Sequence, residues 1–168
     1  MLGRELVRLC GRQLPMVTLH AVDLPAVDIS DAAATDGLIG RLAPTLVINA
    51  AAYTDVDGCE RHQELAWAVN AEGPGNLARS CLEHGARLVQ VSTDFVFDGR
   101  KRVPYVPGDA INPLSVYGRS KAEGERRVRE ALGDHVIVRT SWLFAAQGRN
   151  FVRTILGLAA RDDELRVV

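Results

Sequence analysis

The chain of 168 residues lacks several features that define whole classes of protein. Its three cysteines, Cys10, Cys59 and Cys81, are scattered and form no C-x-x-C pair, which argues against a disulfide framework and suits buried thiols in a reducing compartment. No apolar run reaches the roughly 18 residues of a membrane-spanning helix. The first residues do not have the basic-then-apolar layout of a signal peptide. We therefore expect a cytoplasmic protein without a membrane partner.

An excess of charge of one sign is also absent. Twenty basic and 21 acidic residues leave a net charge of −1 and a pI near 6.4. A protein that binds nucleic acid through phosphates carries a basic field, so no nucleic-acid partner is expected. What is present is ordinary for a globular protein, with 47% hydrophobic and 24% charged residues. The length suits one domain with a real core, and we expect a single domain over residues 1–168.

Short apolar runs alternate with longer helical patterns along the chain. This alternation predicts parallel βαβ units and an α/β fold with a doubly wound parallel sheet. A turn-rich segment over 94–114 is long for a compact domain, which is typical of a functional loop. The expected helices cover 2–14, 31–42, 64–84 (disturbed at Gly73-Pro74), 116–132 and 150–161, and the expected strands cover 16–22, 45–49, 87–91 and 135–139.

Ligands of such sheets bind at the carboxyl ends of the strands. Three segments rich in small and hydroxyl residues follow predicted strand ends directly, over 49–53, 92–94 and 140–142. Side chains of this size let a flat ligand lie against the backbone. Ordinary loop starts are the alternative interpretation for any one segment, but three together favour a binding edge.

One pair of residues carries recognisable chemistry. Tyr117 and Lys121 stand at i and i+4, on one face of a predicted helix. A lysine ammonium beside a phenol lowers the tyrosine pKa from its reference value near 10, so that the phenol can pass a proton to a developing alkoxide. Thr93 ends a predicted strand upstream, and its hydroxyl is expected to hold the substrate oxygen. A threonine, a tyrosine and a lysine on a doubly wound sheet indicate carbonyl reduction by a nicotinamide.

Longer motifs surround these residues. The segments V-S-T-D-F-V-F-D-G at 91–99 and Y-G-R-S-K-A-E-G-E at 117–125 occur together with N-A-A-A-Y-T-D-V-D-G at 49–58 and V-R-T-S-W-L-F at 138–144. With these motifs the chain resembles the extended short-chain dehydrogenase/reductases, and within them the dTDP-4-dehydrorhamnose reductases. The resemblance implies a Rossmann-like fold. It also implies reduction of the C4 keto group of dTDP-4-dehydro-L-rhamnose to dTDP-L-rhamnose with NADPH or NADH. The implied substrate partner is a dTDP-4-keto-6-deoxy sugar, and no metal is implied.

The resemblance also implies roles for matching positions. Tyr117 would donate the proton, Lys121 would lower the Tyr117 pKa and bind the nicotinamide ribose, and Thr93 would orient the 4-keto oxygen. Asn70 matches a helix position that supports the lysine through water; a polar residue beside a proline kink is the alternative. The remaining cofactor positions are Gly3, Asp28, Ile29, Ala50, Ala51, Ala52 and Tyr53, and the remaining substrate positions are Asp94, Phe95 and Trp142.

Two departures from the family pattern stand out. Phe95 replaces the tyrosine that usually follows S-T-D, which removes a hydroxyl from the sugar site. Of the family's G-x-x-G-x-x-G turn only Gly3 is present. We therefore expect a partial Rossmann domain that lacks the first strand and the C-terminal substrate domain. Unpaired strand edges in such a domain favour pairing with a second copy, so a homodimer is a further expectation.

Two alternatives to an active reductase stay open at this stage. One is a non-catalytic NADP-binding subunit resembling the regulatory β subunit of methionine adenosyltransferase, and the other is an inactive fragment. Charged side chains without a role in the proposed site are expected to face solvent. The basic run 100–102 is interpreted as a turn, with a nucleotide phosphate as the alternative. A solvated helix face is expected from Glu123, Glu125, Arg126, Arg127, Arg129 and Glu130.

Overall fold

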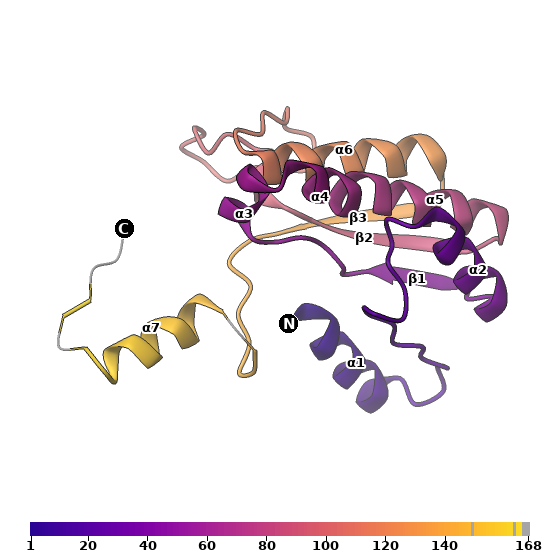
Figure 1. Ribbon diagram of the computed structural model, residues 1–168, viewed down its shortest axis with the longest axis horizontal. Coiled ribbons are helices and arrows are strands. Elements are labelled where there is room, and N and C mark those ends of the chain that lie inside the picture. Colours follow the sequence, from indigo (N-terminus) through magenta and orange to yellow (C-terminus); the bar gives the residue numbers. More distant parts are fainter. Residues whose placement is uncertain (149, 163, 166–168) are drawn as a thin grey trace. The chain divides into compact units, whose positions relative to one another are not determined.

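The computed structural model describes residues 1–148, 150–162 and 164–165. They form two compact units, which are described one by one. The larger unit is Val22–Thr140, and the smaller unit combines Met1–Ala21 with Ser141–Val168. The larger unit contains the sheet (Figure 1) and most of the predicted site residues.

Three parallel strands form the sheet of the larger unit, in the order β1-β2-β3. They are β1 (Leu46–Asn49), β2 (Arg87–Thr93) and β3 (His135–Thr140). In the register Asn49 stands beside Gln90 and Thr93 beside Thr140, so β2 and β3 end level. Three of the four expected strands, and the parallel Rossmann-like fold, are thereby confirmed.

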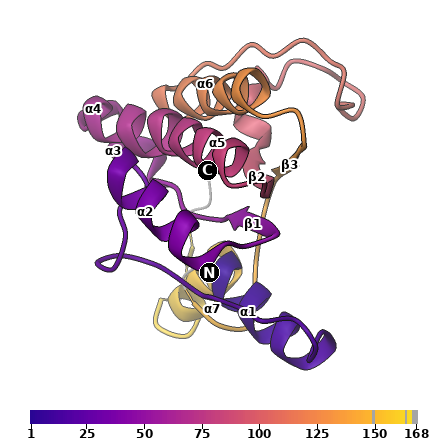
Figure 2. The ribbon, with the colours of Figure 1, turned by 90° about the vertical axis from the view of Figure 1, so that its right-hand side faces the viewer.

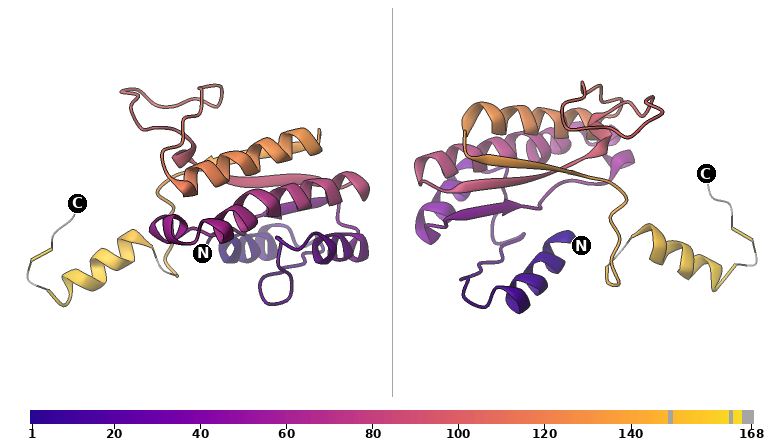
Figure 3. Two further views of the ribbon diagram at one scale, coloured as in Figure 1. Left: turned by 45° about the horizontal axis from the view of Figure 1, so that its top comes forward. Right: turned by 180° about the vertical axis from the view of Figure 1, so that it is seen from behind.

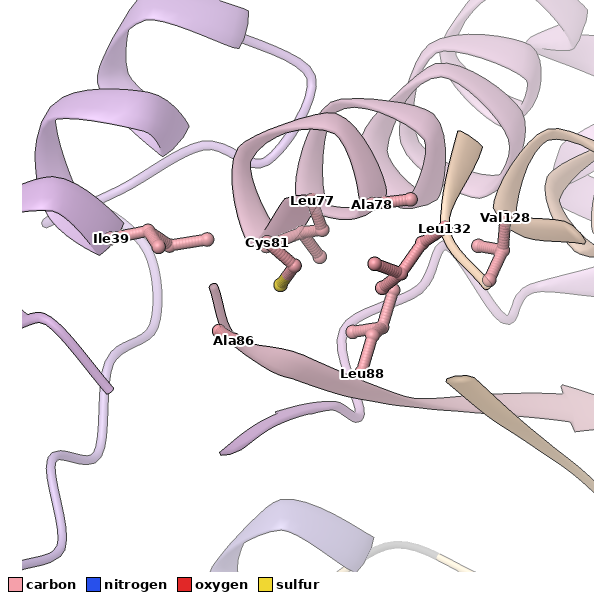
Figure 4. Close-up of a cluster of buried hydrophobic side chains, with 8 residues drawn as sticks. All are labelled: Ile39, Leu77, Ala78, Cys81, Ala86, Leu88, Val128 and Leu132. Atoms are coloured by element: carbon pink, nitrogen blue, oxygen red, sulfur yellow. The ribbon is translucent and has the colours of Figure 1, made fainter. Parts of the chain in front are cut away.

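Helices α2 (Ala32–Leu42), α5 (Gly73–Glu83) and α6 (Val116–Ala131) lie side by side in one layer over the sheet (Figure 2). Between this layer and β2 lies a cluster of buried apolar side chains (Figure 4). Leu88 of β2 is completely buried in it, as is Cys81 of α5. Burial raises the pKa of the Cys81 thiol to about 11, which keeps it an inert, protonated core residue. The cluster consists of Ile39, Leu77, Ala78, Cys81, Ala86, Leu88, Val128 and Leu132.

Side-chain caps begin the helices where the sequence predicts them. The Asp31 carboxylate accepts a hydrogen bond from the Ala34 N–H at 3.0 Å and starts α2. Ser115 does the same for the Gly118 N–H at the start of α6, at 3.1 Å. A short helix that is not predicted from the sequence, α3 (Val56–Arg61), is capped by Asp55.

The helix expected over 64–84 is present but changes its winding at the predicted disturbance. It runs as α4 (Gln63–Trp67), a π-helical turn (Ala68–Glu72) and α5. Pro74 has no N–H to donate to the Asn70 carbonyl one turn earlier, so the regular ladder cannot continue there. Helix α6 approaches the π-helical turn closely at Gly124, where a Cβ would lie 2.2 Å from the Asn70 carbonyl oxygen.

The strand expected over 16–22 is wrong. These residues form no regular element, and the Met16 side chain is 95% exposed. A strand is stable only when its backbone N–H and C=O groups meet a neighbouring strand. Within the described sheet β1 pairs with β2 alone, so no described strand lies beside 16–22.

The smaller unit contains two helices, α1 (Leu2–Gln13) and α7 (Phe151–Ala159). Asn150 caps α7 by accepting from the Arg153 N–H at 3.1 Å. The Trp142 ring meets the Phe151 ring edge-on at 5.6 Å. No helix in the described part of the chain combines the length and apolarity needed to cross a bilayer.

Candidate active site

The site lies where β2 ends and α6 begins. Thr93, Tyr117 and Lys121 are all buried there, with exposed fractions of 5%, 9% and 4%. Tyr117 and Lys121 lie one turn apart on α6, as the spacing predicts. The Phe95 ring packs edge-on against the Tyr117 ring, at 5.5 Å between centroids. The structure thus brings the predicted catalytic residues to one strand end.

Thr93 is held by the turn that follows β2. Its hydroxyl accepts a hydrogen bond from the Phe95 N–H at 3.2 Å and donates to the Asp94 carboxylate at 3.1 Å. The turn packs directly on α6 because residue 118 is glycine, where a Cβ would lie 2.3 Å from the Phe95 carbonyl oxygen. This close approach sets Thr93 and Phe95 beside the Tyr117 phenol.

The Lys121 ammonium is bound inside the protein. Its Nζ donates to the Val91 carbonyl of β2 at 2.8 Å. Burial lowers the pKa of Lys121 to about 8, and the negative charge of Glu125 opposes that shift. Lys121 is therefore mostly protonated at neutral pH but loses its charge within reach of mildly alkaline conditions.

The predicted lowering of the Tyr117 pKa is not found in this structure. Burial raises the pKa of the phenol, and the neighbouring Thr93 hydroxyl only partly opposes this. The negative charge of Asp94 acts in the same direction as burial. The physical reason is that desolvation disfavours the phenolate while the Lys121 ammonium is engaged at Val91. Tyr117 consequently keeps its proton at neutral pH, as a proton donor must.

The predicted cofactor segment 50–53 follows β1 and is fixed by side-chain amides. Asn49 accepts from the Ala51 N–H at 3.0 Å, and its amide donates to Gln90 at 2.8 Å. Asn70 binds both backbone groups of Tyr53, accepting from its N–H at 2.9 Å and donating to its carbonyl at 3.0 Å.

Asn70 also reaches α6, where its amide donates to the Ser120 hydroxyl at 3.2 Å. Its hydrogen bonds are thus to Tyr53 and to the residue before Lys121, while none with Lys121 itself occurs among the described residues. Asn70 fastens the segment after β1 to the helix that carries Tyr117 and Lys121.

Asp28 and Ile29 lie in a turn anchored to α5. The Asn76 amide donates to the Ile29 carbonyl at 2.9 Å, and the Ile29 side chain packs on Gly73. The Asp28 carboxylate is exposed and accepts from the Ser30 hydroxyl and N–H, which lowers its pKa. Gly3 lies in the first turn of α1 and Trp142 is 78% exposed; both belong to the smaller unit, and their roles stay predictions.

The turn-rich segment after β2 is a loop with its own internal order (Figure 3). Asp98 accepts hydrogen bonds from the Arg100 N–H, the Tyr105 hydroxyl and the Asn112 amide, at 3.0, 2.9 and 3.0 Å. These bonds, the Arg100 N–H first, hold the pKa of Asp98 at about 2. Lys101 of the basic run pairs with Asp109 in the same loop, at 2.5 Å.

The environment of Glu125 differs from the prediction. A solvated helix face is expected from the sequence, but the side chain is completely buried and binds Arg139 of β3 at 2.7 and 2.9 Å. Arg129 donates to the same carboxylate at 2.8 Å. The expectation was wrong because Glu125 stands four residues after Lys121, on the face that α6 turns to the sheet. The neighbouring pairs of Arg126 with Glu123 and Glu130 are largely exposed, as expected.

Comparisons with known proteins agree with this geometry. A family model described as the RmlD substrate binding domain matches residues 1–168. The chain is 45% identical to a dTDP-4-dehydrorhamnose reductase of Streptomyces griseus, over 100% of the chain and 55% of that protein. It is 42% identical to one from Aggregatibacter actinomycetemcomitans, over 99% of the chain and 56% of that protein.

Solved structures give the same result. A dTDP-4-dehydrorhamnose reductase of Clostridium acetobutylicum superposes with a TM-score of 0.95 at 41% identity, covering 99% of this chain and 59% of that one. One from Bacillus anthracis, solved in complex with NADP, has a TM-score of 0.90 at 34% identity and covers 95% of this chain and 57% of that one. The chain spans somewhat more than half the length of these relatives.

Proposed function

The chain belongs to the RmlD substrate binding domain family, and from this premise we propose that its protein is an NAD(P)H-dependent reductase of a dTDP-4-keto-6-deoxy sugar. The reaction would convert the C4 keto group of dTDP-4-dehydro-L-rhamnose into the hydroxyl of dTDP-L-rhamnose. The observation that carries the proposal is the buried set of Thr93, Tyr117 and Lys121 at the carboxyl end of β2. Relatives that are 42% and 45% identical to the chain are dTDP-4-dehydrorhamnose reductases.

The residues present fit a nicotinamide cofactor. Ala50, Ala51 and Ala52 follow β1 with side chains no larger than a methyl group, so a flat ligand can approach the backbone there. The Lys121 ammonium has three donors, and within the described residues one of them is used, on Val91. These residues, with Asp28 and Ile29, would hold NADPH or NADH, which supplies the hydride when bound.

The protein's own residues would then handle the oxygen of the sugar. Thr93 would turn its hydroxyl proton from Asp94 to the C4 carbonyl oxygen and so fix the direction of that oxygen. As C4 is reduced, negative charge grows on that oxygen, and Tyr117 transfers its phenolic proton to it. The O–H bond of Tyr117 breaks, the new sugar O–H bond forms, and the buried Lys121 ammonium stabilises the phenolate left behind.

The direct test is turnover of the dTDP-4-keto sugar by the intact protein, followed by loss of NADPH absorbance. Tyr117→Phe removes the proton donor and is expected to lower kcat by about 10²–10⁴-fold, with the NADPH dissociation constant little changed. Tyr105→Phe, in the loop after β2, is the matched control. Turnover by Tyr117→Phe close to that of the unmodified protein would contradict the proposal. NADPH binding without any turnover in the unmodified protein would point to a binding subunit instead.

A further inference from the structure

Glu125 is a fully buried carboxylate that the proposed reaction does not use. Arg139 binds it through two nitrogens and Arg129 through a third. Arg139 is itself fixed, because its side chain is 16% exposed and its guanidinium lies 5.0 Å from the centre of the Phe97 ring. The bonds from the arginines lower the pKa of Glu125, which overcomes the opposite effect of burial. The carboxylate therefore carries a permanent negative charge inside the protein.

This charge lies next to the reactive end of α6. Side chains at i and i+4 on a helix are neighbours, with Cβ atoms about 5–6 Å apart, so Glu125 stands directly behind Lys121. The two do not form a hydrogen-bonded pair in the described structure, since the ammonium points along β2 to the Val91 carbonyl. Glu125 therefore acts on Lys121 through its field and leaves the ammonium donors free for other partners.

Few other charges reach Lys121. Tyr117 lies on the same helix face as Lys121, and Asp94 and Cys59 are neighbours of Tyr117. Arg139 and Arg129 bind Glu125 and not Lys121. Near Lys121, β2 contributes neutral groups: the Gln90 amide, which donates to the same Val91 carbonyl at 2.8 Å, and the buried Ser92 hydroxyl beside Glu125. Glu72 of the π-helical turn pairs with Arg127. The charged side chains of α4 and α5 are exposed, namely Glu64, Arg79 and Glu83.

We propose that Glu125 is a positioning residue, which keeps Lys121 protonated and its ammonium directed to the end of β2. The inference rests on the proposed function, in which the charge of Lys121 stabilises the Tyr117 phenolate. Without Glu125, the cations Lys121, Arg139 and Arg129 would lie close together with no negative charge between them. Lys121 is the only one of the three that can readily lose its proton. The alternative is that Glu125 merely fastens α6 to β3.

The titration of Lys121 separates these two roles and needs no turnover. Residues 1–168 include two lysines, Lys101 and Lys121, so this part of a protein labelled with [ε-¹³C]lysine contributes two titrating NMR signals. The Lys101→Arg variant identifies which signal belongs to Lys121. In Glu125→Gln we expect the Lys121 midpoint to move to lower pH by about one pH unit or more. Glu123→Gln, on the same helix but paired with outer arginines, is the matched control and should leave the midpoint in place.

A second variant covers the case in which Glu125→Gln does not fold. Arg129 is 45% exposed, and Arg129→Ala removes a cation without leaving Glu125 unpaired. Its expected effect is opposite in sign, since less positive charge near Lys121 moves the midpoint to higher pH. A Lys121 midpoint that stays unchanged in the folded variants would overturn the proposal, even if their stability falls.

The pH dependence of turnover gives an independent readout. Activity that needs protonated Lys121 is present below its pKa and lost as the pH rises through it. Because Glu125→Gln lowers that pKa, the alkaline loss of kcat should begin at lower pH, while Glu125→Asp should restore part of the range. Failure of the Tyr117→Phe test would refute the proposed reaction and leave the lysine titration unaffected, so the two failures are distinguishable.

Discussion

Lys121 is a buried polar residue whose hydrogen bond to the backbone replaces hydrogen bonds to water. Its ammonium is nearly buried, and Thr93, Asn70 and Asn49 are buried polar residues of the same region. Each has a hydrogen-bond partner on a different element or turn. A buried polar group without such a partner is costly, so these side chains have little freedom to move. The groups that would meet a substrate are thus fixed before it arrives.

Asn70 offers a test of this at one residue. Asn70→Ala removes the partner of the Tyr53 N–H, the Tyr53 carbonyl and the Ser120 hydroxyl at once. We expect the free energy of unfolding to fall by about 1–3 kcal/mol, since each group left unsatisfied loses its bond. Urea unfolding followed by circular dichroism measures this.

The control for Asn70→Ala is Asn112→Ala, an exposed side chain with one hydrogen bond, to Asp98. Its loss should cost less than about 1 kcal/mol. Equal urea midpoints for the two variants would show that Asn70 is not a structural clamp.

Helix α6 approaches the π-helical turn before α5 closely at one point, where Gly124 meets the Asn70 carbonyl. Gly124→Ala should destabilise the protein by about 1–3 kcal/mol, because its Cβ would meet a backbone oxygen that cannot rotate away. Gly37→Ala makes the same change inside α2, where nothing lies within 4 Å of the new Cβ. It should raise stability by about 0.5–1 kcal/mol, because alanine is the better helix former. Thermal unfolding of both variants checks the prediction, and shifts of the same sign would contradict it.

Elements that local chemistry determines could be predicted from the sequence. Asp31 and Ser115 cap helices whose starts the sequence indicates, and the apolar run 45–49 contains β1. The segment 16–22 has the composition of a strand, but strand formation depends on a partner that a local pattern does not contain. The same limit applies to the site. The spacing of Tyr117 and Lys121 is local, whereas burial of Glu125 depends on Arg139, which comes from another strand.

At the scale of the whole molecule, we expect different parts of the chain to differ in their resistance to proteases. The larger unit contains the sheet and the cluster of buried apolar side chains beneath α2, α5 and α6. The segments that lead into it carry exposed apolar side chains outside regular structure, among them Met16 at 95%, Leu24 at 67% and Phe144 at 72% exposed. Proteases cut such segments before they cut strands or packed helices.

Brief chymotrypsin treatment should therefore cut first within 14–24 and 142–144. The surviving fragment, identified by mass spectrometry, should contain all of 46–140. The loop after β2 should be cut later, because Asp98 and the Lys101–Asp109 pair hold it together. A first cut after Leu88 or Tyr117 would show that the larger unit is not the protected one.

The bond between Glu125 and Arg139 has one more consequence, for how β3 finds its alignment during folding. Side chains alternate along a strand, so sliding β3 by one residue would turn Arg139 to the opposite face of the sheet. Val138 would then meet the buried carboxylate, and Glu125 would lose both bonds from β3. The observed alignment, with Ser92 beside Arg139 and Thr93 beside Thr140, adds two bonds from β3 to the one that Glu125 receives from Arg129. This ion pair thus favours the strand pairing that sets the ends of β2 and β3 level beside Tyr117.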